Sequence, residues 1–194
     1  MLRLILVSVL IIFSIVEGAE EKAQFQGLLL EPPRKINSVT FVNKDGDTEE
    51  FPGSRKIYRV VFFGFTKCTM VCPRGMQKMA AVRKELASLA NRVEYYFISV
   101  DPGRDTSAVV KTFIERFDPK IQGLTGDEKV ALAVQKEFQI LTRKFRGKTA
   151  LTYNMQHSAY IYVLDESGRL KIVFPAKNTP SDIAVDINQL LKKD

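Results

Sequence analysis

The sequence is poor in thiol and imidazole side chains, with only two cysteines and one histidine among 194 residues. A structural zinc site usually takes four protein ligands, so zinc would need Asp, Glu or water to complete its coordination here. An inert disulfide also explains the cysteine pair poorly, because residues four apart close a very short loop that constrains little of the unfolded chain. Cys68, Cys72 and His157 are therefore the first candidates for chemistry.

A membrane-spanning apolar run is also missing at the amino terminus. The stretch from Leu4 to Val16 follows Arg3 and is shorter than the roughly 20 residues that a spanning helix needs. With the small residue Gly18 beyond it, this pattern predicts a secretory signal peptide over residues 1–18, and an uncleaved amino-terminal anchor is the alternative. The protein is thus expected to be exported, and to be periplasmic or membrane-associated facing the periplasm.

The remaining chain is expected to hold one domain. Residues 19–37 are polar and include Pro32 and Pro33, so they predict a flexible linker. Residues 38–194 are long enough for a single compact core, since domains usually run about 100–200 residues. Neither repeats nor low-complexity tracts interrupt this segment.

The charge of the protein belongs to this domain. The formal net charge is +7, and removal of residues 1–18 takes away one Arg and one Glu, which leaves it unchanged. Such a surface suits an acidic partner or an anionic membrane, while an ordinary solvated surface is the alternative; export argues against nucleic acid. The basic residues that would form such a docking face are Lys67, Arg74, Lys78, Arg83, Lys84, Arg143, Lys144, Arg146 and Lys148.

Alternating apolar runs and helical patterns predict an α/β sandwich with a mixed sheet. The segment 39–42 with its Asn-Lys-Asp-Gly turn predicts an amino-terminal β-hairpin, and further strands are expected at 58–63, 95–100, 159–164 and 170–174. Helices are expected from Pro73 to about Leu89, at 109–117, at 130–138 and near the carboxyl terminus. Residues 141–156 are basic and aperiodic, so they predict a long surface loop.

The cysteine pair lies where a strand turns into a helix. Thioredoxin-type folds hold reactive sulfur at such a turn. Pro73 disfavours helical geometry at Cys72, which places Cys72 at the helix cap and Cys68 in the preceding loop. The helix terminus, with Lys67 and Arg74, favours the thiolate form of these sulfurs.

Two kinds of chemistry fit this arrangement. A loop lets the sulfurs form a disulfide or hold a metal, so thiol-disulfide exchange is one candidate. Two thiolates and one imidazole also form a trigonal set that Cu(I) accepts and that can be expanded for Cu(II). Of the methionines, Met76 and Met79 fall on the apolar helix face and are expected in the core, whereas Met70 and Met155 lie beside the candidate ligands.

Several segments, in order, resemble the Sco family, also called SenC, over about Val39 to Leu190. The matching residues are Phe62-Phe63-Gly64-Phe65-Thr66-Lys67-Cys68 with Cys72-Pro73, Ile98-Ser99-Val100-Asp101-Pro102 with Arg104-Asp105-Thr106, Gly123-Leu124-Thr125-Gly126, and His157-Ser158. The family comprises exported, thioredoxin-fold proteins implicated in copper delivery to cytochrome c oxidase. The resemblance implies a thioredoxin-like α/β sandwich and assigns copper binding to Cys68, Cys72 and His157.

The resemblance also implies a function. It favours a copper metallochaperone or assembly factor for the copper centre of a haem-copper oxidase, with the copper-bearing oxidase subunit or another copper protein as the partner. Such a protein is not an enzyme in the strict sense. The alternative is an exported thiol-disulfide oxidoreductase that reduces a copper-protein client through Cys68 and Cys72.

The chain departs from the usual family pattern at two places near these ligands. Thr69 and Met70 stand where proline and an acidic residue commonly follow the first cysteine, and Gln156 stands where aspartate commonly precedes the histidine. Loss of these carboxylates removes negative charge that favours a bound cation. We therefore expect a lower copper affinity and more prominent dithiol chemistry.

Overall fold

The computed structural model describes residues 24–145, 147 and 152–193. The signal peptide predicted over residues 1–18 lies outside this part of the chain. Among the described helices, none combines the length and the apolar character that are needed to cross a bilayer.

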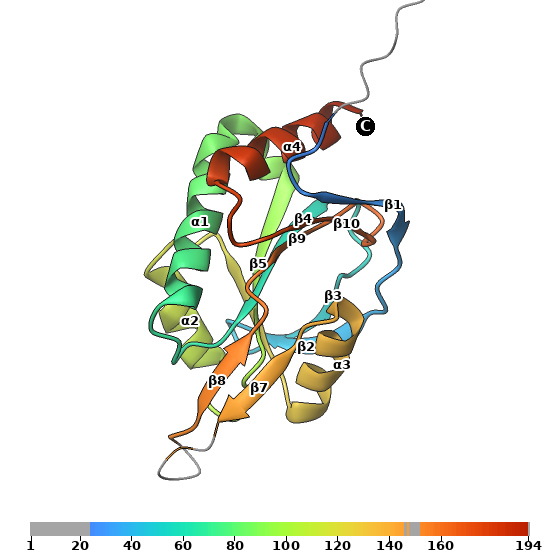
Figure 1. Ribbon diagram of the computed structural model, residues 1–194. Coiled ribbons are helices and arrows are strands. Elements are labelled where there is room, and N and C mark those ends of the chain that lie inside the picture. Colours follow the sequence, from blue (N-terminus) through green and yellow to red (C-terminus); the bar gives the residue numbers. More distant parts are fainter. Residues whose placement is uncertain (1–23, 146, 148–151, 194) are drawn as a thin grey trace, which may run out of the picture.

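An eight-stranded mixed sheet forms the centre of the molecule (Figure 1). In order across the sheet, the strands are β1 (Leu28–Arg34), β10 (Leu170–Phe174), β9 (Ile161–Leu164), β4 (Tyr58–Gly64), β5 (Val93–Ser99), β6 (Gln122–Thr125), β2 (Val39–Asn43) and β3 (Thr48–Phe51). β4, β5 and β6 are parallel, whereas the other neighbours pair antiparallel. The predicted mixed sheet and amino-terminal hairpin, β2 with β3, are confirmed.

Helices cover both faces of this sheet (Figure 1). One face carries α1 (Val71–Glu85), α2 (Ser107–Glu115) and α4 (Pro180–Lys193), and the other carries α3 (Glu128–Phe138). Consecutive side chains of β4 point to opposite faces. Phe62 accordingly packs under Gly75 of α1, and Phe63 packs on Phe138 of α3. All of β4 is buried, as expected of a central strand covered on both faces.

A second, two-stranded sheet lies beside the main one. It consists of β7 (Thr142–Phe145) and β8 (Asn154–His157), which pair antiparallel with Thr142 opposite His157. The long surface loop predicted over residues 141–156 is therefore wrong at its two ends, because these ends pair as strands. A two-stranded ribbon with little buried surface has no strong apolar alternation, which explains why the pattern was missed.

The linker predicted over residues 19–37 is also wrong in its second half. Residues 28–34 form β1, which pairs with β10 at the edge of the sheet. Proline is tolerated in an edge strand because one side of that strand needs no ladder hydrogen bonds, so Pro32 and Pro33 do not prevent pairing. The folded domain thus begins before residue 38.

Candidate metal centre

The candidate site forms where β4 ends and α1 begins. Cys68 lies half-buried in the connecting loop, and Cys72 is buried in the first turn of α1. The helix begins at Val71, two residues before the predicted start at Pro73. Proline is accommodated because N–H groups in the first turn have no intrahelical acceptor. Neither cysteine forms a disulfide in this structure.

The fold brings His157 to the same edge of the sheet. β9 runs antiparallel to β4, with Ile161 opposite Phe62, so the start of β9 meets the end of β4. His157 ends β8 just before β9 begins. Its Nε2 lies 3.2 Å from Sγ of Cys72, although the two residues are 85 positions apart in the chain. The three sequence-predicted residues are therefore brought together.

The two sulfurs differ in their acidity. The backbone N–H of Cys72 donates to Sγ of Cys68 at 3.2 Å. The pKa of Cys68 is lowered to about 5, chiefly because the Cys72 thiol donates to its sulfur, and backbone N–H groups of the helix start add to this effect. The opposite holds for Cys72, whose pKa is raised by its bond to Cys68 and by burial. Cys68 is thus the thiolate of the pair and Cys72 the protonated partner.

The imidazole of His157 is held in one tautomer. Its Nδ1 lies 3.0 Å from the carbonyl oxygen of Ser158, so Nδ1 carries the proton that it donates to this acceptor. Burial lowers the pKa of His157, while the Ser158 carbonyl and Cys68 act in the opposite direction. The ring is therefore neutral at pH 7, with the lone pair of Nε2 facing Cys72, as a metal ligand requires.

Cys72 links the other two side chains, since its residue contacts the sulfur of Cys68 on one side and Nε2 of His157 on the other. In the described residues no group of three or more His, Cys, Asp or Glu side chains stands ready to hold a metal ion. The donor set nevertheless fits a soft metal, since it offers one thiolate, a second sulfur next to it and a neutral imidazole. Metal binding would displace the thiol proton of Cys72.

Aromatic rings and a glycine shape the walls of the site. Phe62 and Phe65 both pack edge-on against the imidazole, with ring centroids 6.1 Å and 5.8 Å from it. A Cβ atom on Gly64 would lie 3.0 Å from Sγ of Cys72 and 2.9 Å from the ring of Phe97. Gly64 therefore leaves the space that the buried sulfur occupies.

A buried carboxyl group, that of Asp105, is hydrogen-bonded to the start of the loop that carries Cys68. Asp105 is fully buried and accepts hydrogen bonds from the backbone N–H of Thr66 at 3.0 Å, from its hydroxyl at 2.6 Å and from the hydroxyl of Ser99 at 2.7 Å. Burial raises the pKa of Asp105. These bonds fix the start of the loop that carries Cys68.

A second group of residues connects the β7–β8 hairpin to the body of the protein. Arg104 donates to the side chain of Asp101 at 2.5 Å and to the backbone carbonyl of Tyr153 at 2.8 Å. Its guanidinium carbon also lies 3.8 Å from the centre of the Tyr153 ring, and the Tyr153 hydroxyl donates to Asp101. We call Asp101, Arg104 and Tyr153 the latch, because they hold the segment that leads to His157.

Other predicted neighbours of the site differ in placement. Met76 and Met79 lie in the core as predicted, fully buried. Met70 is 64% exposed beside the cysteines, whereas Met155 is buried in the hydrophobic core. Sequence reasoning assigned no role to Asp105 or Tyr153. The clue for Asp105 was its position in a turn after a buried strand that neighbours β4.

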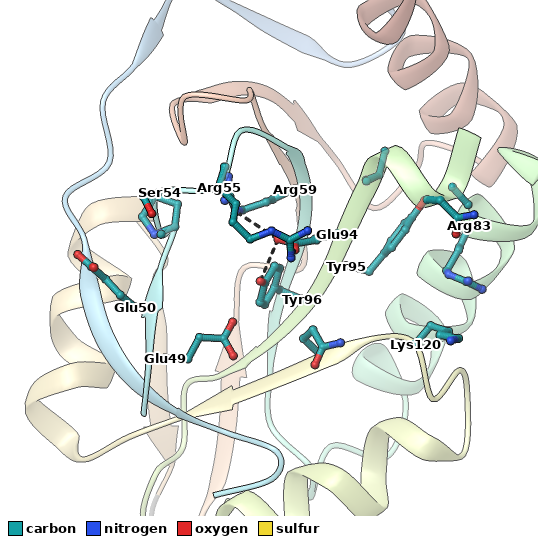
Figure 2. Close-up of a pocket in the computed structure, with 16 residues that line it drawn as sticks. Glu49, Glu50, Ser54, Arg55, Arg59, Arg83, Glu94, Tyr95, Tyr96 and Lys120 are labelled. Carbon is teal, nitrogen blue, oxygen red and sulfur yellow. Dashed lines mark hydrogen bonds and ion pairs between the residues drawn. The ribbon is translucent and has the colours of Figure 1, made fainter. Parts of the chain in front are cut away.

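A large cavity lies away from the sulfurs. It measures about 820 Å³ and is lined by residues at the amino ends of β4 and β5, the edge opposite Gly64 (Figure 2). Its central charges are paired within the protein, since Arg55 and Arg59 both face Glu94. Ligands of open α/β sheets bind at the carboxyl ends of the strands, where the cysteines lie. The candidate site at the sulfurs therefore lies where this rule expects a ligand.

Fold and site together define a thioredoxin-like protein with a dithiol at a strand-to-helix turn and an imidazole facing it. The chain matches the model of the SCO1/SenC family over residues 31–192, and it belongs to that family. An SCO2-like protein of Rickettsia felis is 30% identical over 138 residues, which cover 71% of this chain and 66% of that relative. The chain thus spans slightly less than two thirds of this relative's length.

Solved structures show the same fold. Bradyrhizobium japonicum ScoI with copper bound has a TM-score of 0.73 and 31% identity, covering 79% of this chain and 98% of that one. BsSco, in which a disulfide switch was identified, has a TM-score of 0.68 and 22% identity, covering 88% of this chain and 99% of that one. BsSco is described as a member of the Sco family of cytochrome c oxidase assembly proteins.

Proposed function

We propose that this protein binds copper through Cys68, Cys72 and His157 and delivers it during assembly of a haem-copper oxidase. The observation that carries the proposal is the convergence of Nε2 of His157 on Sγ of Cys72, at 3.2 Å, from a hairpin distant in the sequence. Copper is cargo in this proposal. The copper-bound relative from Bradyrhizobium japonicum supports it, as does the description of the family as oxidase assembly proteins.

Each residue has a distinct task in copper capture. Cys68 is half-buried and acidic, with a pKa of about 5, so it offers a thiolate to an incoming ion at pH 7. Cys72 is buried and protonated, so its thiol proton has to leave to solvent as the ion binds, while Nε2 of His157, 3.2 Å from its sulfur, keeps its lone pair for the metal. The Ser158 carbonyl keeps Nδ1 protonated and Nε2 open.

We further propose that the protein acts after export. The predicted signal peptide or anchor places the domain in the periplasm or at the membrane surface that faces it. The copper-bearing subunit of a cytochrome c oxidase, or another exported copper protein, would be the client. The basic surface suits an acidic client.

A thiol-disulfide oxidoreductase is the second candidate, and the difference between the two sulfurs favours it. Cys68 is a reachable thiolate that can attack a client disulfide, and buried Cys72 can then attack the mixed disulfide and release the reduced client. The protein is oxidised to the Cys68–Cys72 disulfide as the client is reduced. Another exported reductant would have to regenerate the dithiol.

The two candidates are separated by removal of His157. Copper delivery needs the imidazole, whereas disulfide exchange needs only the two sulfurs. We expect that cells carrying His157→Ala fail to assemble the oxidase at limiting copper, as do cells carrying Cys68→Ser. If His157→Ala cells assemble the oxidase normally while Cys68→Ser cells do not, the reductase is the function and the delivery proposal is wrong.

A further inference from the structure

A small apolar cleft opens beside the sulfur pair. Its volume is about 230 Å³, and its walls come from α1, from the end of β4 and from the ends of β9 and β10 that lie nearest the site. The side chains and backbone that line it are mostly apolar and include Phe62, Val71, Gly75, Ile161, Phe174 and Pro175. The volume is small, so the cleft suits one side chain of a partner rather than a cofactor.

The cleft adjoins the candidate metal centre through Val71 and Phe62. Val71 lies in the chain between the two cysteines, next to Cys72. Phe62 lines the cleft and also packs against the ring of His157, with centroids 6.1 Å apart. A group that fills the cleft therefore lies next to the sulfurs.

Apolar surface remains uncovered at the mouth of the cleft. Val71 is 45% exposed, and the adjacent Met70 is 64% exposed. Single exposed apolar side chains are common on protein surfaces. Here, however, Val71 lines an apolar hollow and precedes Cys72, with exposed Met70 next to it in the chain, and such a combination marks an interaction site.

Two basic residues, Arg74 and Lys78, line the cleft, and Lys67 precedes Cys68 in the chain. The sequence contains no Asp or Glu between residues 66 and 84, while Lys67 and Arg74 are exposed on either side of the cysteines. Within the described part of the chain, neither Lys67 nor Arg74 forms an ion pair. Lys78 adds charge at the far wall, where it donates to the carbonyls of Ala176 and Asn178.

We infer that this cleft docks an extended segment of an acidic client, with one apolar side chain in the hollow and carboxylates over Lys67 and Arg74. The inference rests on the proposed function, because it places the client's sulfur or copper ligand at Cys68. A second copy of this chain is a poor occupant, since each copy carries a formal charge of +7. A membrane surface is also a poor occupant, since the hollow holds a single side chain.

Thiol-disulfide exchange with short peptides tests the inference without copper. The probe is a capped peptide, Asp-Leu-Cys-Glu, whose cysteine is joined to thionitrobenzoate. The Cys68 thiolate attacks the peptide sulfur, a protein–peptide disulfide forms, and thionitrobenzoate leaves as a coloured thiolate with the electron pair of the broken bond. Two matched peptides serve as controls. In one, Lys replaces both acidic residues, and in the other, Ser replaces Leu.

We expect the acidic leucine peptide to react about tenfold faster than either matched peptide at low salt, because docking raises the local concentration of its disulfide. Added salt should reduce the rate advantage of the acidic peptide over the lysine peptide and leave its rate advantage over the serine peptide unchanged. Arg74→Glu should abolish the preference for acid. Lys84→Glu is the matched control, since it makes the same charge change at an exposed position of the same helix, away from the cleft.

Equal rates for the three wild-type peptides would overturn the inference. So would a Lys84→Glu protein that loses the preference as fully as Arg74→Glu, because the effect would then come from net charge alone. Equal rates together with binding to phosphatidylglycerol vesicles that Arg74→Glu removes would assign this face to a membrane instead. The peptide preference and copper uptake are measured separately, so either proposal can fail while the other holds.

Discussion

The thiols of the two cysteines have pKa values shifted in opposite directions because their surroundings differ. Cys68 accepts hydrogen bonds at a helix start and is half-buried, whereas Cys72 is buried between Gly64 and the imidazole. The first sulfur is therefore prepared to meet a copper ion or a disulfide, and the second completes the reaction. This division of roles serves both candidate functions.

Alkylation of the reduced protein should reveal this division. The thiolate is the reactive form, and the pKa of Cys68 is about 5. The rate of reaction with iodoacetamide should be flat from pH 8 down to about pH 6 and then fall about tenfold per pH unit below about pH 5. Peptide mapping should find the label on Cys68.

The control for this experiment is Cys68→Ser, which should be nearly unreactive because Cys72 is fully buried and burial by itself raises the pKa of its thiol. A half-point near pH 8.5, as for an ordinary cysteine, would contradict the assignment of Cys68 as the thiolate.

The candidate trio could be predicted from the sequence because these residue types are so scarce. Their unequal acidity could not, since it depends on backbone N–H groups and on burial that only the folded loop creates. The role of Tyr153 was equally hidden, because its partner Asp101 lies 52 positions away in the chain.

Among the elements, the β7–β8 hairpin decides where His157 lies. In the part of the chain that the structure describes, β7 and β8 pair with no strand of the main sheet, so the position of the hairpin depends on side-chain contacts with the rest of the domain. The latch of Asp101, Arg104 and Tyr153 provides these contacts near His157, and Thr142 adds a hydrogen bond to Gln135 of α3 at 2.7 Å. The hairpin can therefore present the imidazole in a fixed place.

Tyr153→Phe should weaken copper binding by releasing the hairpin. The change removes one hydrogen bond to Asp101, which is worth about 0.5–1.5 kcal/mol, so we expect Cu(I) affinity to fall about 2- to 10-fold. Competition with a chromophoric Cu(I) chelator measures the affinity. In a His157→Ala background the same change should have no effect, since no imidazole remains to be positioned.

Tyr160→Phe is the matched control, because Tyr160 is 42% exposed and lies only three positions beyond His157. It should leave Cu(I) affinity unchanged. If Tyr153→Phe weakens binding equally with and without His157, the latch does not act through the histidine.

Elements were predictable where burial was strong and hidden where it was weak. The fully buried strand β4 follows from its continuous apolar run. The hairpin strand β7 is half-exposed and basic, and β1 contains two prolines, so neither carries a clear strand signal. β1 is fixed by pairing with β10, far along the chain, and the β7–β8 hairpin is held by side chains such as Arg104 and Asp101 that lie about 50 positions earlier; a local pattern shows neither.

At the scale of the whole molecule, the first described residues close onto the last helix (Figure 1). Asp186 of α4 is fully buried and accepts hydrogen bonds from the backbone N–H groups of Gln26 and Gly27, each at 2.8 Å. Asn178 donates to the carbonyl of Gln26 at 3.1 Å. These bonds join β1 and α4 into one folded unit.

Asp186→Ala should destabilise this unit without removing the copper site. Loss of the carboxylate leaves two backbone N–H groups without their acceptor, at a cost of about 1–3 kcal/mol each. Urea unfolding measures the cost, and the folded variant should still bind one Cu(I).

Asp45→Ala provides the comparison, since Asp45 forms only an exposed ion pair with Lys111. Its effect on the free energy of unfolding should be within about 0.5 kcal/mol. If the Asp186→Ala protein is as stable as the Asp45→Ala protein, the hydrogen bonds from Gln26 and Gly27 to Asp186 contribute little to the free energy of unfolding.

X-ray absorption spectroscopy of the reduced protein loaded anaerobically with one equivalent of Cu(I) tests the central claim most directly. The account predicts a three-coordinate ion with two sulfur neighbours and one imidazole nitrogen, and loss of the nitrogen contribution in His157→Ala. A copper ion without an imidazole neighbour in the wild-type protein, or a spectrum that His157→Ala leaves unchanged, would contradict the account.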